Sequence, residues 1–205
     1  MTAGGSDAEE RQLIEKSRKG DVVAFDQLVR RYERNVFNAA YRMSGSYDDA
    51  SDISQEAFVR AWNNLKSFRG DAAFSTWLYR IVTNIFLDDR KRKKNRRHQS
   101  LDEERELDES NVARQYEDPS PGPQELAEGE ERRRILEQAI ASLPENQRAI
   151  MVLYHNQGLA YEEIAEITGL PMGTVKSRLN RARLALRDRL GPVAELFLPN
   201  VSPTG

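Results

Sequence analysis

The sequence GLAYEEIAEITGLPMGTVKSRLNRARLALRDR, residues 158–189, is the part of the chain around which the rest can be interpreted. Ile164 and Ile167 give a first short helix a small apolar face. Gly169 supplies a tight turn because glycine tolerates a positive φ. Pro171 then fits the first turn of a second helix, where its missing N–H costs no hydrogen bond. This order of elements predicts a helix-turn-helix.

The second helix of this unit has one apolar stripe and one donor-rich face. The stripe, at steps of three and four residues, consists of Val175, Leu179, Ala182, Leu186 and Leu190. The donors on or beside the opposite face are Lys176, Ser177, Arg178, Asn180, Arg181 and Arg183. Such side chains suit guanine edges and phosphates in a major groove. An ordinary amphipathic helix with a charged solvent face is the alternative, and the short helix, glycine turn and proline weigh against it.

Composition limits the classes of protein that this chain can be. With 205 residues, 31% of them charged and 39% hydrophobic, it suits one large or two small soluble domains, and the loss of apolar periodicity in the middle favours two. The absence of cysteine excludes disulfides, zinc fingers and thiol chemistry. His98 and His155 are too far apart in sequence to suggest a metal site. GLPMGTVKS lacks phosphate-loop spacing, so neither an enzyme nor a cofactor is expected.

Charge is strongly segregated along the chain although the net charge is only −2. Residues 90–97 carry seven positive charges in eight positions, whereas residues 98–131 hold twelve acids against two arginines. No apolar run approaches the roughly 18 residues of a membrane span. The N-terminus has no hydrophobic signal core. We therefore expect a cytoplasmic protein without membrane insertion.

The N-terminal half predicts two long helices before a glycine-containing loop. The first begins after the capping residue Asp21 and ends near Gly45, and the second begins at Ser46. The first half of the second helix gathers the polar residues Asp48, Asp49, Asp52, Gln55 and Glu56. Acids in the first turn suit the helix dipole. Those beyond it could equally be a solvated face or dock a basic partner.

A third helix follows the loop at residues 67–71 and continues into the basic run. Its apolar stripe starts at Phe74, and Trp62 and Trp77 are expected in the hydrophobic core. Its polar side is predicted to present Tyr79, Arg80, Thr83 and Asn84. Aromatic and amide groups beside a cationic track suit single-stranded nucleic acid, because bases stack on rings and phosphates follow the charge.

Three segments in this order resemble the extracytoplasmic-function (ECF) sigma factors of bacterial RNA polymerase. They are DISQEAFVRAW (52–62), FRGDAAFSTWLYRIVTN (68–84) and LAYEEIAEITGLPMGTVKSRLNRAR (159–183). The resemblance covers nearly the whole chain apart from the ends and the acidic middle. One departure is Ala160, where Ser or Thr commonly caps the first short helix.

The resemblance implies an all-α fold with two small domains joined by a flexible acidic linker. Residues 8–97 would form a domain similar to sigma region 2, and residues 124–191 a domain similar to region 4. The linker would span residues 98–123 and the tail 192–205. By charge alone the linker is either a tether or a mimic of nucleic acid in a basic channel.

The resemblance also implies residue roles and partners. Asp49, Asp52, Gln55 and Glu56 would bind the polymerase core. Phe68 would hold an extruded base of the −10 element, Asn84 would read its edge and Arg80 would steady the strand. Lys176, Ser177, Asn180 and Arg181 would read the −35 element, with Arg178 and Arg183 nearer phosphate, although Arg178 could be a structural contact.

A sigma factor of this kind would direct transcription initiation at a stress-response regulon and would have an anti-sigma factor as a partner. Two other classes remain open from the residues alone. A stand-alone DNA-binding regulator would use the same C-terminal motif on duplex operators, and for a pure interaction protein the DNA-binding face would be incidental. The ordered N-terminal motifs argue against both.

Overall fold

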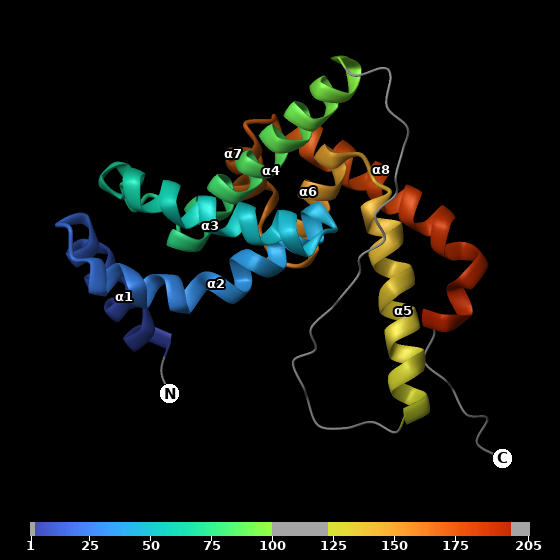
Figure 1. The fold of residues 1–205 in the computed structure, drawn as a ribbon, viewed down its shortest axis with the longest axis horizontal. Coiled ribbons are helices and arrows are strands. Elements are labelled where there is room, and N and C mark those ends of the chain that lie inside the picture. The colour runs from blue at the N-terminus through green and yellow to red at the C-terminus, as the bar shows by residue number, and fades with distance from the viewer. Residues whose placement is uncertain (1–2, 100–122, 198–205) are drawn as a thin grey trace.

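The computed structural model describes residues 3–99 and 123–197, and these residues are helical with no β-strand. The elements are α1 (Ala3–Arg18), α2 (Val22–Ser44), α3 (Tyr47–Asn64), η1 (Leu65–Ser67), α4 (Phe74–Gln99), α5 (Pro123–Ala141), α6 (Glu145–His155), α7 (Tyr161–Thr168), α8 (Met172–Leu190) and η2 (Gly191–Phe197) (Figure 1). The all-α prediction is confirmed. Most of the predicted linker lies outside the described residues.

The N-terminal domain is built from α1 to α4, with α2, α3 and α4 packed against one another. The Asp21 carboxylate caps α2 by accepting a hydrogen bond from the Ala24 N–H at 3.0 Å. Gly45 ends α2 with a φ of 74°, a left-handed conformation that favours glycine. Ser46 then caps α3, as the sequence predicted. The buried side chains include Leu28, Met43, Leu78 and Phe86.

The C-terminal domain contains the predicted helix-turn-helix, formed by α7 and α8. Gly169 makes the turn with a φ of 65°, and Ile164 and Leu179 are buried between the helices. Ala160 has no side-chain oxygen with which to cap α7. The Glu163 carboxylate partly replaces that cap, because its Oε2 accepts a hydrogen bond from the Ala160 N–H at 2.9 Å. Helix α5 runs beside α8 at the far side of this domain (Figure 1).

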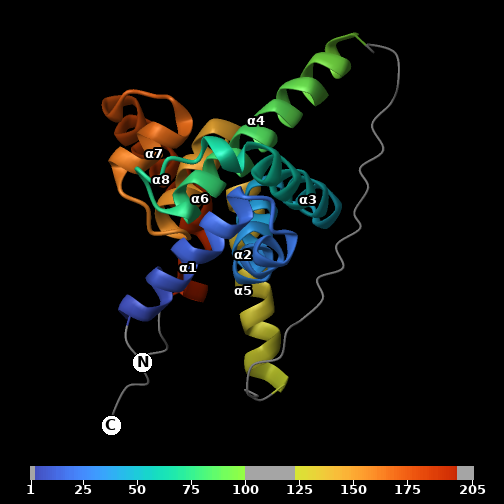
Figure 2. The ribbon, with the colours of Figure 1, turned by 90° about the vertical axis from the view of Figure 1, so that its left-hand side faces the viewer.

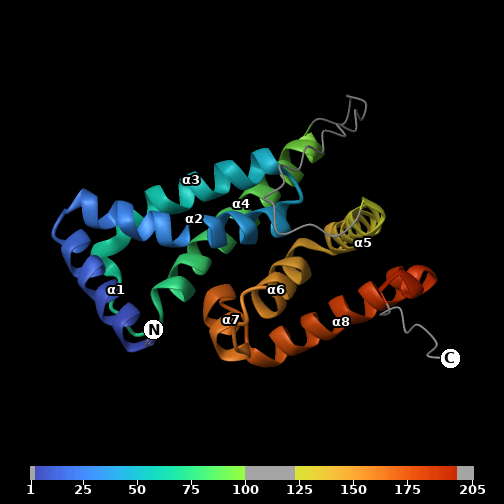
Figure 3. The ribbon, with the colours of Figure 1, turned by 90° about the horizontal axis from the view of Figure 1, so that it is seen from below.

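The two domains pack directly against each other, with α2 and α4 of one facing α5, α6 and α7 of the other. Seen from below, the helices from α1 to α4 form one group and those from α6 to α8 a second group beside it (Figure 3). The end of α4 that carries the basic run projects beyond this body (Figure 2). The buried side chains of both domains form a continuous hydrophobic cluster. This contact was not predicted from the sequence.

Candidate nucleic-acid interface

The outward face of α8 gathers the six donor side chains predicted to contact duplex DNA. Val175, Leu179 and Ala182 are buried and fix the opposite side of the helix. The donors are all exposed except the half-buried Arg178: Lys176, Ser177, Arg178, Asn180, Arg181 and Arg183. The Ser177 hydroxyl donates to the Thr174 carbonyl at 3.0 Å. The structure therefore leaves five of the six predicted donors of α8 exposed to solvent.

Two of these cations lie against a pair of stacked tyrosines. The rings of Tyr154 and Tyr161 are nearly parallel, with centroids 5.1 Å apart. Lys176 Nζ lies 5.5 Å from the Tyr161 centroid, and Arg183 Cζ lies 5.1 Å from the Tyr154 centroid. Attraction between a cation and a ring face restrains both side chains. The four residues thus form a ladder of cation, ring, ring and cation, which the sequence did not predict.

His155 adds to this ladder from the end of α6. Burial and then the positive charge of Arg183 lower the pKa of His155 below its usual value. The imidazole is therefore neutral at pH 7, and its Nε2 lies 3.4 Å from the Arg183 Nε, where it can accept a hydrogen bond. The imidazole further restrains the Arg183 guanidinium beside the surface predicted to contact DNA.

A second polar surface lies where the end of α3 meets α4. A groove there is lined by Arg60, Asn64, Ser67, Trp77, Ile81 and Asn84. It combines one ring, one guanidinium and two amides, which are groups that bind bases and phosphates. Of these residues, only Asn84 was singled out from the sequence as a contact to DNA. Trp77 was expected in the core and is instead half-buried, packed against the core and lining the groove.

Phe68, the predicted base-holding aromatic, belongs to a buried aromatic cluster. Only 8% of its surface is exposed. Its ring meets Phe74 edge-on at 5.6 Å and lies 5.2 Å from the Trp77 ring, centroid to centroid. A base could stack on Phe68 only after the loop before α4 moved. In this conformation the ring supports Trp77 at the edge of the groove.

The predicted polar side of α4 is largely covered. Tyr79 and Thr83 were expected to face outward, and both are buried, with 6% and 0% of their surfaces exposed. This part of the prediction is wrong because α4 packs against α6 and α7 as well as α2 and α3. Arg80 is half-exposed, and its guanidinium lies 3.7 Å from the Glu166 carboxylate of α7. Asn84 remains exposed.

On the acidic face of α3, Asp49 binds cations of α4, whereas the other predicted docking residues are exposed. Asp49 accepts from the Arg90 guanidinium at 2.8 Å and from the Lys93 ammonium at 2.7 Å. Partial burial lowers the pKa of Lys93, but hydrogen bonds and negative charge from Asp49 and Asp89 outweigh it, so the pKa is raised. Asp52 and Gln55 are exposed. Asp49 therefore ties α3 to the start of the basic run.

Glu56 is also exposed but has a partner on its own helix. Its carboxylate accepts from the Arg60 Nε at 2.9 Å, one turn further along α3. This places the Arg60 guanidinium beside the groove. Arg60 and Asn64 were missed from the sequence although each follows a polar residue of α3 at a spacing of four, which puts Glu56, Arg60 and Asn64 on one side of the helix.

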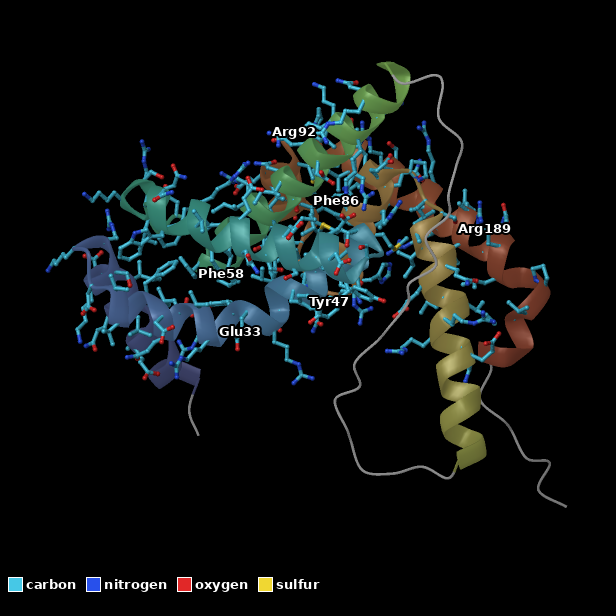
Figure 4. The ribbon with its side chains drawn as sticks, viewed as in Figure 1. Glu33, Tyr47, Phe58, Phe86, Arg92 and Arg189 are labelled. Carbon is cyan, nitrogen blue, oxygen red and sulfur yellow. The ribbon has the colours of Figure 1, made fainter. Side chains whose placement is uncertain are left out.

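The remaining cations of the basic run lie on the projecting part of α4. Lys91, Arg92, Lys94 and Arg96 are exposed there, and Figure 4 shows Arg92 where the helix leaves the body. Among the described residues there is no cluster of three or more potential metal ligands. Within the same part of the chain, no helix is both long and apolar enough to cross a bilayer.

A helix-turn-helix with a donor-rich second helix, joined to a helical domain with a polar groove and a basic extension, defines a two-domain nucleic-acid-binding protein. Residues 28–97 match the family Sigma-70 region 2, and residues 133–186 match Sigma-70, region 4. The chain belongs to the ECF sigma factors of this family, as the sequence motifs indicated. It is a transcription initiation factor that binds RNA polymerase and recognises promoter DNA.

Similarity to individual proteins extends over most of the chain. It is 39% identical over 184 residues to the ECF RNA polymerase sigma-E factor of Escherichia coli strain K12, covering 88% of this chain and 94% of that one. Identity to the ECF sigma factor SigW of Bacillus subtilis strain 168 is 37% over 180 residues, covering 88% and 96%.

Solved structures of similar chains have a similar fold. The sigma factor RpoE in complex with the anti-sigma factor NepR from Bartonella quintana matches with a TM-score of 0.65 and 26% identity, covering 83% of this chain and 98% of that one. CnrH in complex with the cytosolic domain of CnrY matches with a TM-score of 0.62 and 26% identity, covering 90% and 98%.

Proposed function

We propose that this sigma factor reads the −35 element through α8 and the −10 element through the groove between α3 and α4. The observation that carries the proposal is the exposed face of α8, where burial of Val175, Leu179 and Ala182 leaves five of the six donor side chains exposed and Arg178 half-buried. A helix of this shape and polarity fits a B-DNA major groove.

On α8, the contacts divide into base readout and phosphate binding. Arg181 and Asn180 have the planar groups that make bidentate contacts to guanine and adenine edges. Lys176 and Ser177 lie one turn earlier on the same exposed face. Arg183, restrained by Tyr154 and His155, and the half-buried Arg178 neutralise phosphates at the edges of the groove. Phosphate contacts set the register, and base contacts carry the sequence preference.

At the −10 element, the groove receives one base that has left the stack. Asn84 reads its edge, and Trp77 supplies the apolar wall. Arg80 steadies the backbone of the strand, and Phe68 contributes by supporting Trp77 or by contacting the base after a loop movement. Extruding a base costs a few kcal/mol, which these contacts and those of the polymerase offset.

Docking of the polymerase core involves the exposed acidic face of α3. Asp52, Gln55 and Glu56 are available for a basic surface, whereas Asp49 serves docking only indirectly while it binds Arg90 and Lys93. The chain acts by binding rather than by catalysis and without a cofactor. Its place of action is the cytoplasm, where polymerase and promoter DNA meet.

We also propose that an anti-sigma factor controls this chain. The support is that both solved structures described above are complexes of a sigma factor with such a partner, or with the cytosolic domain of a second protein. An inhibited initiation factor suits a regulon that is needed only under stress.

Run-off transcription tests the proposed function. Purified core polymerase would be supplied with fragmented genomic DNA of the source organism, with and without this protein, and the new start sites mapped. Starts that share two spaced upstream elements are expected. If polymerase gained no start and did not bind the protein, while the protein alone bound duplex DNA specifically, a stand-alone regulator would replace the proposal.

A further inference from the structure

Helix α1 precedes the segment that matches Sigma-70 region 2, which begins at residue 28. It packs along α2 and also contacts η1, the short helical turn that follows α3. Leu13 and Ile14 anchor it in the core, with 9% and 7% of their surfaces exposed. Figure 3 shows α1 at the end of the N-terminal domain opposite to the basic end of α4. Neither of the two proposed DNA surfaces, nor the docking face of α3, includes a residue of this helix.

A hydrogen bond joins α1 to α2. The Tyr32 hydroxyl of α2 donates to the Glu10 carboxylate of α1. Burial, and then this hydrogen bond, raise the pKa of Tyr32 above its usual value, so the phenol is protonated and donates at neutral pH. The Glu10 side chain is half-buried, and Arg31 Nη1 lies 3.6 Å from the same carboxylate oxygen. A charge-assisted hydrogen bond of this kind holds the phenol ring in one place beside α1.

The ring of Tyr32 is the first in a series of ring contacts that ends in the groove. It lies 5.4 Å, centroid to centroid, from Phe74, the first residue of α4. Phe74 in turn lies 5.5 Å from Trp77 and 5.6 Å from Phe68. Trp77 lines the groove in which a base of the −10 strand is proposed to bind. Tilted ring pairs at these distances attract each other beyond the effect of the area they bury, so the position of Trp77 depends on that of Tyr32.

Helix α1 supports another part of the groove through η1. Leu65, the first residue of η1, is only 1% exposed. The Ser67 hydroxyl donates to the Asn64 carbonyl at 2.7 Å, and both of these residues line the groove. Because η1 contacts α1, the backbone that carries Asn64 and Ser67 is held by the same helix that holds Tyr32.

The loop between η1 and α4 has little internal structure. Residues 68–73 form no helix or strand, and Arg69, Gly70 and Asp71 are exposed. Gly70 has a φ of 81°, and a Cβ placed there would have no atom within 4 Å. A loop with so few contacts of its own is held in shape mainly by the elements at its two ends. Helix α1 contacts one end directly and the other end through Tyr32.

We propose that α1 is a brace for the groove, and that Glu10 and Tyr32 are positioning residues for recognition of the −10 strand. Neither touches a base. They hold Phe74 and Trp77 in the arrangement that a base enters, and recognition requires side chains held to within about 0.5 Å. The brace therefore sets how well the groove distinguishes one base from another. The inference rests on the proposed function of the groove and adds two residues to it.

Tryptophan fluorescence tests the brace without DNA, because the chain has only two tryptophans. Trp62→Phe keeps a ring against Phe25 and leaves Trp77 as the single tryptophan. In this background, Glu10→Ala should raise the quenching of Trp77 by acrylamide about twofold, because a side chain with fewer fixed neighbours is more accessible to the quencher.

Glu9→Ala is the matched control for this measurement. Glu9 is the neighbouring carboxylate of α1, and it accepts from Arg31 at 3.0 Å rather than from Tyr32. Its removal should leave the quenching of Trp77 unchanged. Equal quenching after Glu9→Ala and Glu10→Ala would show that the hydrogen bond does not position Trp77, and the proposal would be wrong.

Run-off transcription from promoters with each base at each −10 position measures recognition itself. Glu10→Ala should reduce the preference for the best base about fivefold, with polymerase binding and −35 duplex binding unchanged. Glu10→Gln keeps an oxygen that can accept from Tyr32, so it should preserve the preference. A uniform fall in transcription at every base, with the preference intact, would mean that α1 only stabilises the domain. That result would overturn the proposal.

Tyr32→Phe removes the other partner of the same hydrogen bond and keeps the ring against Phe74. It should reduce the preference as much as Glu10→Ala does. Combining the two changes should cause no further loss, because both remove one interaction. Additive losses would show that Glu10 and Tyr32 act separately, which contradicts the brace.

The proposed function of the groove and this inference fail in different ways. If the wild-type chain itself showed no base preference at the −10 element, the groove would not read the strand, and both would be wrong. If the wild-type chain showed a preference that Glu10→Ala retained in full, the groove would keep its role and only the brace would be wrong.

Discussion

The two helices proposed to contact DNA, α4 and α8, differ in what surrounds them. Helix α8 is buried along one stripe only, and five of its six predicted DNA contacts are exposed. Helix α4 is packed on several sides, so that Thr76, Tyr79 and Thr83 are buried and Arg80 is paired with Glu166. The surface proposed for duplex DNA is thus exposed in this structure, whereas the surface proposed for a melted strand is partly covered.

The largest effect on DNA binding is expected at the exposed face of α8. Arg181→Ala should weaken binding to −35 duplex by about 1–3 kcal/mol, a factor of roughly 5 to 150, because a bidentate contact to a base edge is lost. Arg189→Ala removes the same side chain from an exposed position two turns further along α8, as Figure 4 shows for Arg189 near the far end of the helix. Fluorescence anisotropy on a set of single-base variants of the duplex measures both affinity and preference.

Base readout by Arg181 requires that Arg181→Ala and Arg189→Ala differ in both affinity and base preference. Arg189→Ala should lose little affinity and no base preference. If Arg181→Ala weakened all duplexes equally, Arg181 would be a phosphate contact, and readout would have to come from its neighbours on α8.

The next largest effect concerns the contribution of the ion pairs between α3 and α4 to the free energy of unfolding. Asp49→Asn should lower the free energy of unfolding by about 1–2 kcal/mol, because two cations lose a partly buried partner. Asp48→Asn is the matched control, since Asp48 is exposed in the same first turn and contributes mainly through the helix dipole. Urea unfolding followed by circular dichroism gives both values. Equal losses would mean that the dipole, rather than the ion pairs, accounts for the effect of Asp49.

The same contrast shows what the sequence could predict. The apolar stripe of α8 and the glycine turn before it are local patterns, so the helix-turn-helix and the exposed donor side of α8 followed from spacing alone. Asp49 was grouped with its neighbours as a docking residue because its partner Arg90 is 41 positions away. Tyr79 and Thr83 are buried because α4 packs against helices on several sides, and no periodicity within α4 reports that. Trp77 and Arg60 line the same groove because the end of α3 packs against α4, and this contact between two helices could not be predicted from either helix alone.

A smaller effect is expected at the groove. Asn84→Ala should reduce discrimination at one position of the −10 strand by about 1 kcal/mol, as expected for a lost amide contact to a base edge. Asn63→Ala is a suitable control because Asn63 is exposed on α3 and does not line the groove. Initiation from promoter variants with each base at each −10 position gives the discrimination. A uniform drop across all bases would place Asn84 on the backbone of the strand instead.

The smallest expected effect tests whether the stacked rings of Tyr154 and Tyr161 hold Lys176 in place for DNA binding. Tyr161→Ala should leave Lys176 unrestrained, weaken −35 binding by about 0.5–1 kcal/mol and make the salt dependence shallower, by at most about 0.9 in the log–log slope for one phosphate contact. Tyr161→Phe keeps the ring and should preserve both values. Affinities measured from low to high salt give the slope. If Tyr161→Ala lowered affinity with the slope unchanged, the ring would stabilise the fold around α7 without placing a cation on the DNA.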